Sequence, residues 1–284
     1  MTYVPSDKQT TPASLFDLTG RVAIVAGGAG LLGPKHVDAI AGAGGTVVVA
    51  DIDLDAAERV ALGQRDRYKS DVWATRTDIT RPGDVEALVE RVMARHGRVD
   101  ILINNAANNP KVEARGSVAF SRIEHFPLEQ WQRDIEVGLT GAFLCCQIIG
   151  REMAARGAGV IVNIASEYGI IAPDQRLYHV EGVPNDQQPT KPVSYTVVKS
   201  ALIGMTRYLA TYWADRGVRV NSLTVGGIEN GQDAQFLQRA RDRIPLGRMA
   251  HVDEYQGALL LLVSDASSFM TGSNLVVDGG KSCW

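Results

Sequence analysis

A chain of 284 residues, 45% hydrophobic and 21% charged, suits one large α/β domain or two small ones. The formal net charge of −3 gives no broad attraction to nucleic acid or to an anionic membrane, so neither is an expected partner. Residues 1–14 lack the apolar core of a signal peptide, and no stretch reaches the roughly 18 apolar residues of a membrane span. We expect a flexible arm over 1–14, a single domain over 15–284 and a cytoplasmic protein.

Apolar strand-like runs alternate with helical patterns from Arg21 onward. Strands are expected at 22–27, 46–51, 72–78, 100–105, 159–166, 218–225 and 274–279, and the helices between them include 85–97 and a long one at 128–157. Continuous Val/Ile runs indicate strands that are covered on both faces. The alternation predicts an α/β fold with a parallel, doubly wound sheet, whose ligands bind beyond the carboxyl ends of the strands.

The first strand is followed by a glycine-rich loop. Gly28, Gly30 and Gly33 satisfy G-x-G-x-x-G between a strand and a helical run. Such glycines permit a tight turn and close approach of a pyrophosphate, which then faces the amino end of the helix. A lone match can also be an ordinary glycine turn.

The second strand ends at Asp51, near the interval expected for a ribose-binding carboxylate. A carboxylate there accepts hydrogen bonds from an adenosine ribose and repels a 2′-phosphate. Ile52 and Asp53 follow, so no Arg or Lys stands ready for a phosphate, which favours NAD over NADP. The alternative use of Asp51, as a helix N-cap, suits Asp53 better.

Two further strands end in small or polar residues. Asp78 and Ile79 close the third strand, and Asn104, Asn105, Ala106 and Ala107 close the fourth. Either pair could be plain turn chemistry. Several such ends on one edge of a sheet favour a ligand cleft.

Tyr195 and Lys199 are four residues apart in an apolar helical run. On a helix they share a face, with Cβ atoms about 5–6 Å apart. A lysine ammonium stabilises a neighbouring phenolate, so a hydroxyl whose free pKa is about 10 can lose its proton nearer neutrality. Ser166 ends the strand run 159–166, where its hydroxyl can hold a substrate oxygen against the tyrosine. The alternative is a surface Tyr and Lys on an ordinary helix.

The chain resembles the short-chain dehydrogenase/reductase family over residues 17–280. The resemblance lies in the joint order of GGAGLLG, Asp51, Asp78-Ile79, NNAA, the IVNIAS serine, YTVVK and RVNSLTVGGI. It implies a seven-stranded parallel sheet of the Rossmann type and an oxidoreductase that binds a nicotinamide cofactor. It also implies a homo-oligomer, a tetramer or a dimer, joined through helices at 128–157 and 193–216 and the C-terminal segment.

The resemblance assigns roles to individual residues. Ser166 would hydrogen-bond the reacting oxygen, Tyr195 would exchange its proton, and Lys199 would lower the tyrosine pKa and hold the nicotinamide ribose. The cofactor-binding set it implies is Gly27, Gly28, Gly30, Leu31, Leu32, Gly33, Asp51, Ile52, Asp78, Ile79, Asn105, Ala106, Ala107, Tyr195, Lys199, Gly226 and Ile228. No metal is expected.

The chain departs from the family in four places, one of which is Val225-Gly226 where the family usually has Pro-Gly after the sixth strand. The compact branch usually has T-G-x-x-x-G-x-G, whereas Ala26 and Leu31 stand at two of those positions. NNAG has become NNAA, which puts a methyl group at Ala107. The sharpest departure is Gly138, where the family usually places a catalytic asparagine that holds a water. One hypothesis is that a water takes the vacated volume; the alternative is a slowed or inactive enzyme.

Two insertions, 108–126 and 171–192, lie at the edge where such folds bind substrate. Both are polar, and five of their cations could meet an anionic or sugar substrate or be solvated loop charges: Arg115, Arg122, Arg176, His179 and Lys191. Tyr168 and Tyr178 are alternative hydroxyls without a lysine four residues on. Cys145 and Cys146 lie in an apolar helical run and are expected to be buried thiols; with Cys283 they show no metal-ligand spacing.

The sequence favours an NAD-dependent oxidoreductase that transfers hydride between nicotinamide and a small polar secondary alcohol or ketone, with a sugar derivative as one candidate. Two alternatives stay open. An epimerase or dehydratase would return the hydride to its product. A non-catalytic NAD-binding protein would account for Gly138.

Overall fold

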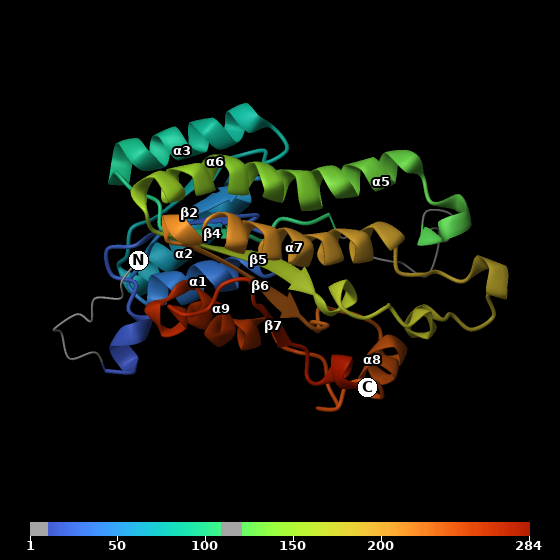
Figure 1. Cartoon of the computed structure of the whole chain (residues 1–284). Helices are drawn as coiled ribbons and strands as arrows, with labels where there is room; N and C mark the ends of the chain where they lie inside the picture. Colours follow the sequence, from blue (N-terminus) through green and yellow to red (C-terminus); the bar gives the residue numbers. More distant parts are fainter. Residues whose placement is uncertain (1–10, 109–120) are drawn as a thin grey trace.

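The structure is a computed structural model that describes residues 11–108 and 121–284. Its centre is a sheet of seven parallel strands in the order β3-β2-β1-β4-β5-β6-β7 (Figure 1). The strands are β1 Val22–Ala26, β2 Thr46–Asp51, β3 Val72–Arg76, β4 Ile101–Asn104, β5 Gly159–Ser166, β6 Val218–Val225 and β7 Asn274–Val277. All seven expected strands are present, each within two residues of its expected end. The doubly wound parallel fold is confirmed.

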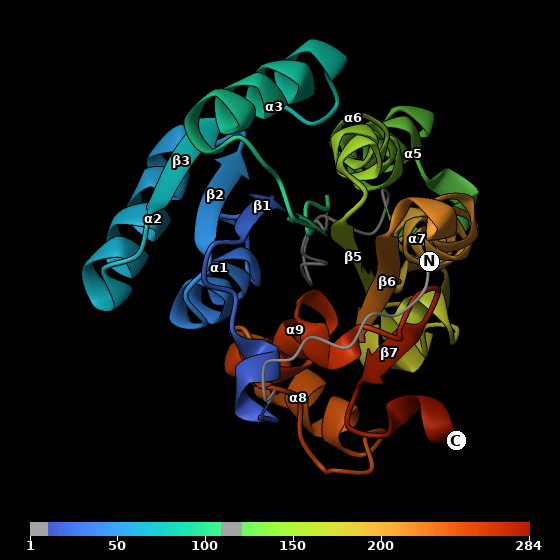
Figure 2. The same cartoon turned by 60° about the vertical axis from the view of Figure 1, so that its left-hand side comes forward.

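Helices cover both faces of the sheet (Figure 2). One face carries α1 Gly33–Gly42, α2 Leu54–Tyr68 and α9 Gln256–Val263, and the other carries α3 Pro82–His96, α6 Gly141–Arg156 and α7 Val193–Tyr212. Alternate residues of β1 serve the two cores: Val25 packs with the first set of helices and Ile24 with the second. A strand buried on both sides has to be apolar throughout, which explains the continuous Val/Ile runs.

The run expected as one helix at 128–157 contains a π-helical turn. Helix α5 covers Leu128–Ile135, the π turn covers Glu136–Thr140, and α6 follows directly. Gly138 is buried within the π turn. A π turn inserts one extra residue into the helical ladder, and such turns frequently occur at functional sites.

The carboxyl edge of the sheet is staggered. Ala26 of β1 is level with Asn104 of β4, and Asn104 is level with Asn163 of β5. Strand β5 continues three residues further to Ser166, which is level with Val225 of β6. The strand order reverses between β1 and β4, so the binding crevice of this fold class opens between their loops. Strands β5 and β6 extend three residues past the ends of β1 and β4.

The insertion at 171–192 forms two 3₁₀ turns, Gln175–Tyr178 and Asn185–Gln187, and no strand. Gln188 closes it through hydrogen bonds to the backbone of Val180 and Val183. Residues 109–120 of the other insertion, including Arg115, lie outside the described residues, as do residues 1–10 of the expected arm. None of the helices in the described ranges is long and apolar enough to cross a membrane.

Candidate active site

The glycine-rich loop is shaped by contacts that exclude side chains. Gly27 has φ +74°, and a Cβ there would lie 2.6 Å from the backbone of Ala106. A Cβ at Gly28 would lie 2.7 Å from Val49, and one at Gly33 would lie 2.5 Å from the Gly27 carbonyl oxygen. Gly30 is exposed, and the nearest atom to its Cβ position is 3.5 Å away. Three glycines therefore fold the loop, and Gly30 keeps the outer surface of the loop clear.

This loop fits a dinucleotide pyrophosphate. Helix α1 begins at Gly33, and its N-cap residue Leu32 makes no side-chain hydrogen bond. The amino end of a helix favours negative charge, and the bare glycine surface lets a phosphate approach the backbone. Leu32 is buried, whereas Leu31 is 51% exposed beside the loop. Of the two leucines, Leu31 is therefore the one that can touch a ligand.

Asp51 holds the loop against the end of β2. Its carboxylate accepts hydrogen bonds from the Ala29 N–H at 2.9 Å and from the Asp53 N–H at 3.1 Å. Asp53 caps α2 by accepting from the Ala56 N–H, as the sequence suggested. Ile52 is 58% exposed next to the carboxylate. Asp51 is thus a half-buried anion fixed by two backbone N–H groups between the glycine loop and the start of α2.

The third and fourth strands end in residues that the sequence assigns to the cofactor. The Asp78 carboxylate accepts from Thr80 N–H and hydroxyl, so it shapes its own turn, and Ile79 beside it is buried. The Asn105 amide donates to the Gly27 carbonyl at 2.7 Å and ties β4 to the glycine loop. Ala106 packs against Gly27 and Ala107 is exposed beyond it.

Gly226 and Ile228 follow β6 at the far side. A Cβ at Gly226 would lie 2.7 Å from the Asp278 backbone, so the glycine allows β6 and the turn after β7 to meet. Ile228 forms an isolated parallel bridge with Ala250 and is half-buried. Their assignment to the cofactor stays a prediction.

Tyr195 lies on the first turn of α7. Ser194 fixes this turn by donating a short hydrogen bond to the buried Asp134 carboxylate of α5. Asn108 and Gln130 donate to the other Asp134 oxygen, each at 2.7 Å. The tyrosine is therefore carried by a helix end that is anchored on two elements.

Ser166, Tyr195 and Lys199 meet at the end of β5. Ser166 is 5% exposed, its hydroxyl accepts from the Tyr168 N–H at 3.3 Å, and its side chain acts on Tyr195 to lower the tyrosine pKa. The Lys199 ammonium donates to the Ile164 carbonyl at 2.7 Å and lies 5.7 Å from the centroid of the Tyr195 ring. The expected common helix face is confirmed. Lys199 is 4% exposed, and burial lowers its pKa to about 8.

The pKa of Tyr195 itself is raised, not lowered as the sequence led us to expect. Burial is the largest cause, because a phenolate loses more hydration than a phenol. The Ser166 side chain lowers this pKa, and the charge of Glu167 raises it. The protein alone therefore holds Tyr195 as a neutral phenol near neutrality.

Lys191 is a second cation beside Tyr195. Its ammonium lies 3.9 Å from the centroid of the tyrosine ring, nearer than that of Lys199. Burial and the charge of Lys199 lower the pKa of Lys191 to about 8. Of the insertion cations within the described ranges, Lys191 alone contacts the ring. Arg176 pairs with Asp174 and is 82% exposed, so it is a solvated loop charge.

Gly138 faces Val198, whose methyl groups take the space next to the glycine. A Cβ at Gly138 would lie 2.7 Å from one Val198 methyl and 3.5 Å from the other. Val198 is 4% exposed and belongs to an apolar cluster with Ala142 and Leu202. A valine methyl therefore occupies the position next to the Gly138 Cα that the first side-chain atom of an asparagine would take.

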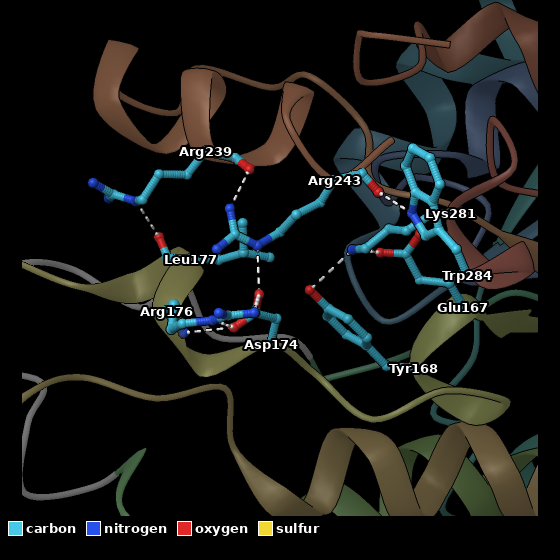
Figure 3. A network of polar contacts seen from close by, with 9 residues as sticks. All are labelled: Glu167, Tyr168, Asp174, Arg176, Leu177, Arg239, Arg243, Lys281 and Trp284. Atoms are coloured by element: carbon cyan, nitrogen blue, oxygen red, sulfur yellow. Dashed lines mark hydrogen bonds and ion pairs between the residues drawn. The ribbon is translucent and has the colours of Figure 1, made fainter. Parts of the chain in front are cut away.

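A third lysine comes from the C-terminus. Lys281 pairs with Glu167, the residue after Ser166, and also contacts the Tyr168 ring (Figure 3). Tyr168 in turn packs edge-on against Tyr195, with centroids 6.4 Å apart. Sequence reasoning noted that Tyr168 has no lysine four residues on. It missed Lys281, because 113 residues separate the two side chains.

A cavity of about 330 Å³ is lined by Tyr178 and its neighbours in the second insertion. It lies between the insertion at 171–192 and α8 Ala234–Arg241, and its polar lining includes Tyr178, His179, Asp233 and Arg239. His179 therefore faces this cavity and not the Tyr195 ring.

The buried Cys145 and Cys146 face the core, as expected, and burial raises the pKa of Cys146 to about 12. No cluster of metal-ligating side chains occurs among residues 11–108 and 121–284.

The sheet, the glycine loop and the Ser166–Tyr195–Lys199 group at one strand edge define a Rossmann-type oxidoreductase. A family model described as enoyl-(acyl carrier protein) reductase matches residues 29–282. An NAD-dependent glycerol dehydrogenase from Listeria innocua is 34% identical, with 99% of this chain and 98% of that protein covered. A D-threitol dehydrogenase from Mycolicibacterium smegmatis is 33% identical, with 93% and 94% covered.

A gluconate 5-dehydrogenase from Burkholderia cenocepacia, solved in complex with NADP and tartrate, superposes with a TM-score of 0.83. It is 29% identical, and 96% of this chain and 100% of that chain are covered. The chain belongs to the short-chain dehydrogenase/reductase family. It is an oxidoreductase that acts on CH–OH groups with a nicotinamide cofactor.

Proposed function

We propose that this protein is an NAD-dependent dehydrogenase of small polyols or related hydroxy acids. The observation that carries the proposal is the Tyr195 ring, which lies within 6 Å of two lysine ammoniums, and the Ser166 side chain lowers the pKa of this tyrosine. Such a group is built to move a proton to or from an alcohol oxygen. The glycerol and D-threitol dehydrogenases, relatives over nearly the whole chain, support a hydroxyl-rich substrate.

Asp51 supports NAD as the cofactor. Its carboxylate is fixed by two backbone N–H groups and keeps lone pairs for ribose hydroxyls. A 2′-phosphate at that place would meet a fixed negative charge. The glycerol dehydrogenase is NAD-dependent, while the gluconate 5-dehydrogenase was solved with NADP, so the preference rests on the carboxylate of this chain.

In the mechanism, each residue has one task. Ser166 holds the substrate oxygen beside the Tyr195 hydroxyl. Tyr195 takes the alcohol proton during oxidation and returns it during reduction. Lys199 and Lys191 favour the phenolate that oxidation requires, because cations near a phenol stabilise its charged form. The bound nicotinamide would supply the hydride chemistry, held by the glycine loop, Asp51 and Lys199.

We also propose a homo-oligomer. Helices α6 and α7 expose Phe143, Tyr208 and Tyr212 at 46%, 65% and 61%. On the edge strand β7, Val276 is 39% exposed. Large apolar side chains gathered on two adjacent helices mark a surface that a second copy of the chain would cover.

The test is NADH formation with glycerol, D-threitol, mannitol and gluconate, each with NAD and with NADP. We expect net NADH production on at least one of these and a higher kcat/KM for NAD. Tyr195→Phe should lower kcat by at least about 1,000-fold while NAD binding, measured by calorimetry, is retained. Substantial activity of that variant would refute the role of Tyr195. NAD binding without net NADH would favour internal hydride return or a non-catalytic protein.

A further inference from the structure

The Glu167–Lys281 ion pair is nearly free of solvent. The Lys281 ammonium lies 2.5 Å from a Glu167 oxygen, and the two side chains are 10% and 3% exposed. A buried pair costs desolvation free energy, and an apolar pair of similar size is often as stable. The stability of the fold alone therefore does not explain why an ion pair stands here in place of an apolar pair. The position of the pair beside Tyr168 and Tyr195 suggests another role.

The pair lies beside Tyr168, the ring that packs against the proposed proton-transfer residue, and Figure 3 shows Lys281 reaching both Glu167 and Tyr168. Glu167 follows Ser166, and its charge acts on Tyr195. Lys281 lies 4.7 Å from the Tyr168 ring centroid and donates to the Tyr168 hydroxyl at 3.4 Å. Tyr168 packs edge-on against Tyr195. The C-terminal 3₁₀ turn Lys281–Cys283 thus reaches the reacting tyrosine through a single intervening ring.

We propose that Lys281 is a positioning residue for the reaction, which cancels the charge of Glu167 so that Tyr195 meets no net negative charge from behind Ser166. The proposal rests on the acid–base role of Tyr195 proposed above. It makes the last residues of the chain part of the active site, although 86 residues separate Lys281 from Tyr195 in the sequence.

Other ionisable groups face the same two side chains. Around Tyr195 these are Lys191, Lys199, Glu167, Tyr168 and Tyr178. Around Glu167 they are Lys281, Asp278, Tyr168, Tyr178, Tyr255 and Lys191. Lys281 is the cation that contacts Glu167 directly, and Glu167 is the one carboxylate that acts on the pKa of Tyr195 within the described part of the chain. Altering either partner therefore changes the field at the tyrosine with a known sign.

The two single variants should move the tyrosine in opposite directions. Lys281→Met leaves the Glu167 carboxylate uncompensated, which disfavours the phenolate and raises the Tyr195 pKa. Glu167→Gln leaves the ammonium uncompensated, which favours the phenolate and lowers that pKa. Removing one unit charge close to a titrating group in a protein changes the pKa of that group by about one unit. The double variant changes no net charge and should return near the wild-type value.

The direct measurement is a spectrophotometric titration of tyrosinate in the full-length protein. Each variant is compared with the same variant carrying Tyr195→Phe, so the difference spectrum reports Tyr195 alone and needs no substrate. Lys281→Arg keeps the charge and should titrate like wild type. Arg95→Met is the matched control, because Arg95 forms a 2.7 Å ion pair with Asp71 at the opposite, amino-terminal edge of the sheet.

We expect an upward shift of about one pH unit for Lys281→Met, a downward shift of similar size for Glu167→Gln, and near-restoration in the double variant. The acid limb of the pH profile of alcohol oxidation should shift in parallel. Shifts in one common direction, or shifts no larger than those of Arg95→Met, would overturn the proposal. If Tyr195→Phe stays active, the proposed function fails first; if it is inactive and Lys281→Met titrates like wild type, only this inference fails.

Discussion

The contact between Gly138 and Val198 makes a quantitative prediction about stability. In Gly138→Ala, the new Cβ would lie 2.7 Å from a Val198 methyl, well inside van der Waals contact, and both residues are buried. Alanine gains about 1 kcal/mol over glycine inside a helix, but overpacking a core costs about 1–3 kcal/mol. We therefore expect a net loss of up to about 2 kcal/mol in the free energy of unfolding.

Val198→Ala removes the two methyls that the new Cβ would meet. It loses about 1.6 kcal/mol of buried apolar transfer, since each buried methylene contributes about 0.8 kcal/mol, together with a cavity cost. In the double variant the alanine at 138 occupies part of that cavity. The two changes should therefore couple favourably, by at least about 1 kcal/mol, within the range found for residues in contact.

The assay is urea unfolding of wild type, both single variants and the double variant at one protein concentration. Additivity within about 0.5 kcal/mol would show that the two side chains do not compete for the same space and would refute the reasoning. The result also decides how Gly138→Asn is read. An asparagine requires more room than alanine, so its effect on turnover reports on proton transfer only when compared within the Val198→Ala background.

Two further predictions concern the cofactor and pH. Asp51→Ala should lower kcat/KM for NAD by about tenfold or more, because the hydrogen bonds to the Ala29 and Asp53 N–H groups are lost, and should raise the NADP/NAD ratio of kcat/KM; an unchanged ratio would contradict the assignment. His36 is fully buried, and burial lowers its pKa to about 4. The unfolded chain then binds a proton that the folded chain does not between about pH 6.5 and 4, so stability falls as the pH falls through this window. His36→Gln should flatten that slope in unfolding titrations, whereas an equal slope would assign it to other groups.

The fold could be predicted from the sequence because its signals are local. A strand covered on both faces is mostly apolar, as in 46–51 and 218–225. That pattern can be recognised from the segment itself, without knowing which strands or helices lie beside it. The common helix face of Tyr195 and Lys199 follows from helix geometry in the same way. The π turn at Glu136–Thr140 does not, because apolar residues continue through it and only the helical ladder changes.

What the sequence could not give are contacts between distant segments. Val198 reads as one more apolar position on α7, and nothing nearby says that its methyl lies against Gly138. Lys281 reads as a tail charge, although its ammonium is buried on Glu167. In the sequence Lys191 is one of several cations in the insertion, and only the packing of the insertion on α7 brings it over the Tyr195 ring. Each of these three contacts depends on how separate elements pack together, and the spacing of residues within one element does not reveal that packing.

Burial favours the neutral form of every ionisable group in the site, and this has opposite consequences for reduction and for oxidation. Burial alone makes Tyr195 hold its proton, which suits reduction, where the tyrosine must donate. Oxidation needs the phenolate, so it depends on the positive charges nearby and on the neutralisation of Glu167. The same burial lowers the pKa of Lys191 and Lys199 to about 8. The two lysines therefore lose their positive charge at a lower pH than the one at which the tyrosine would ionise. The groups around Tyr195 therefore act as one titrating set, and no single lysine fixes the direction of proton transfer.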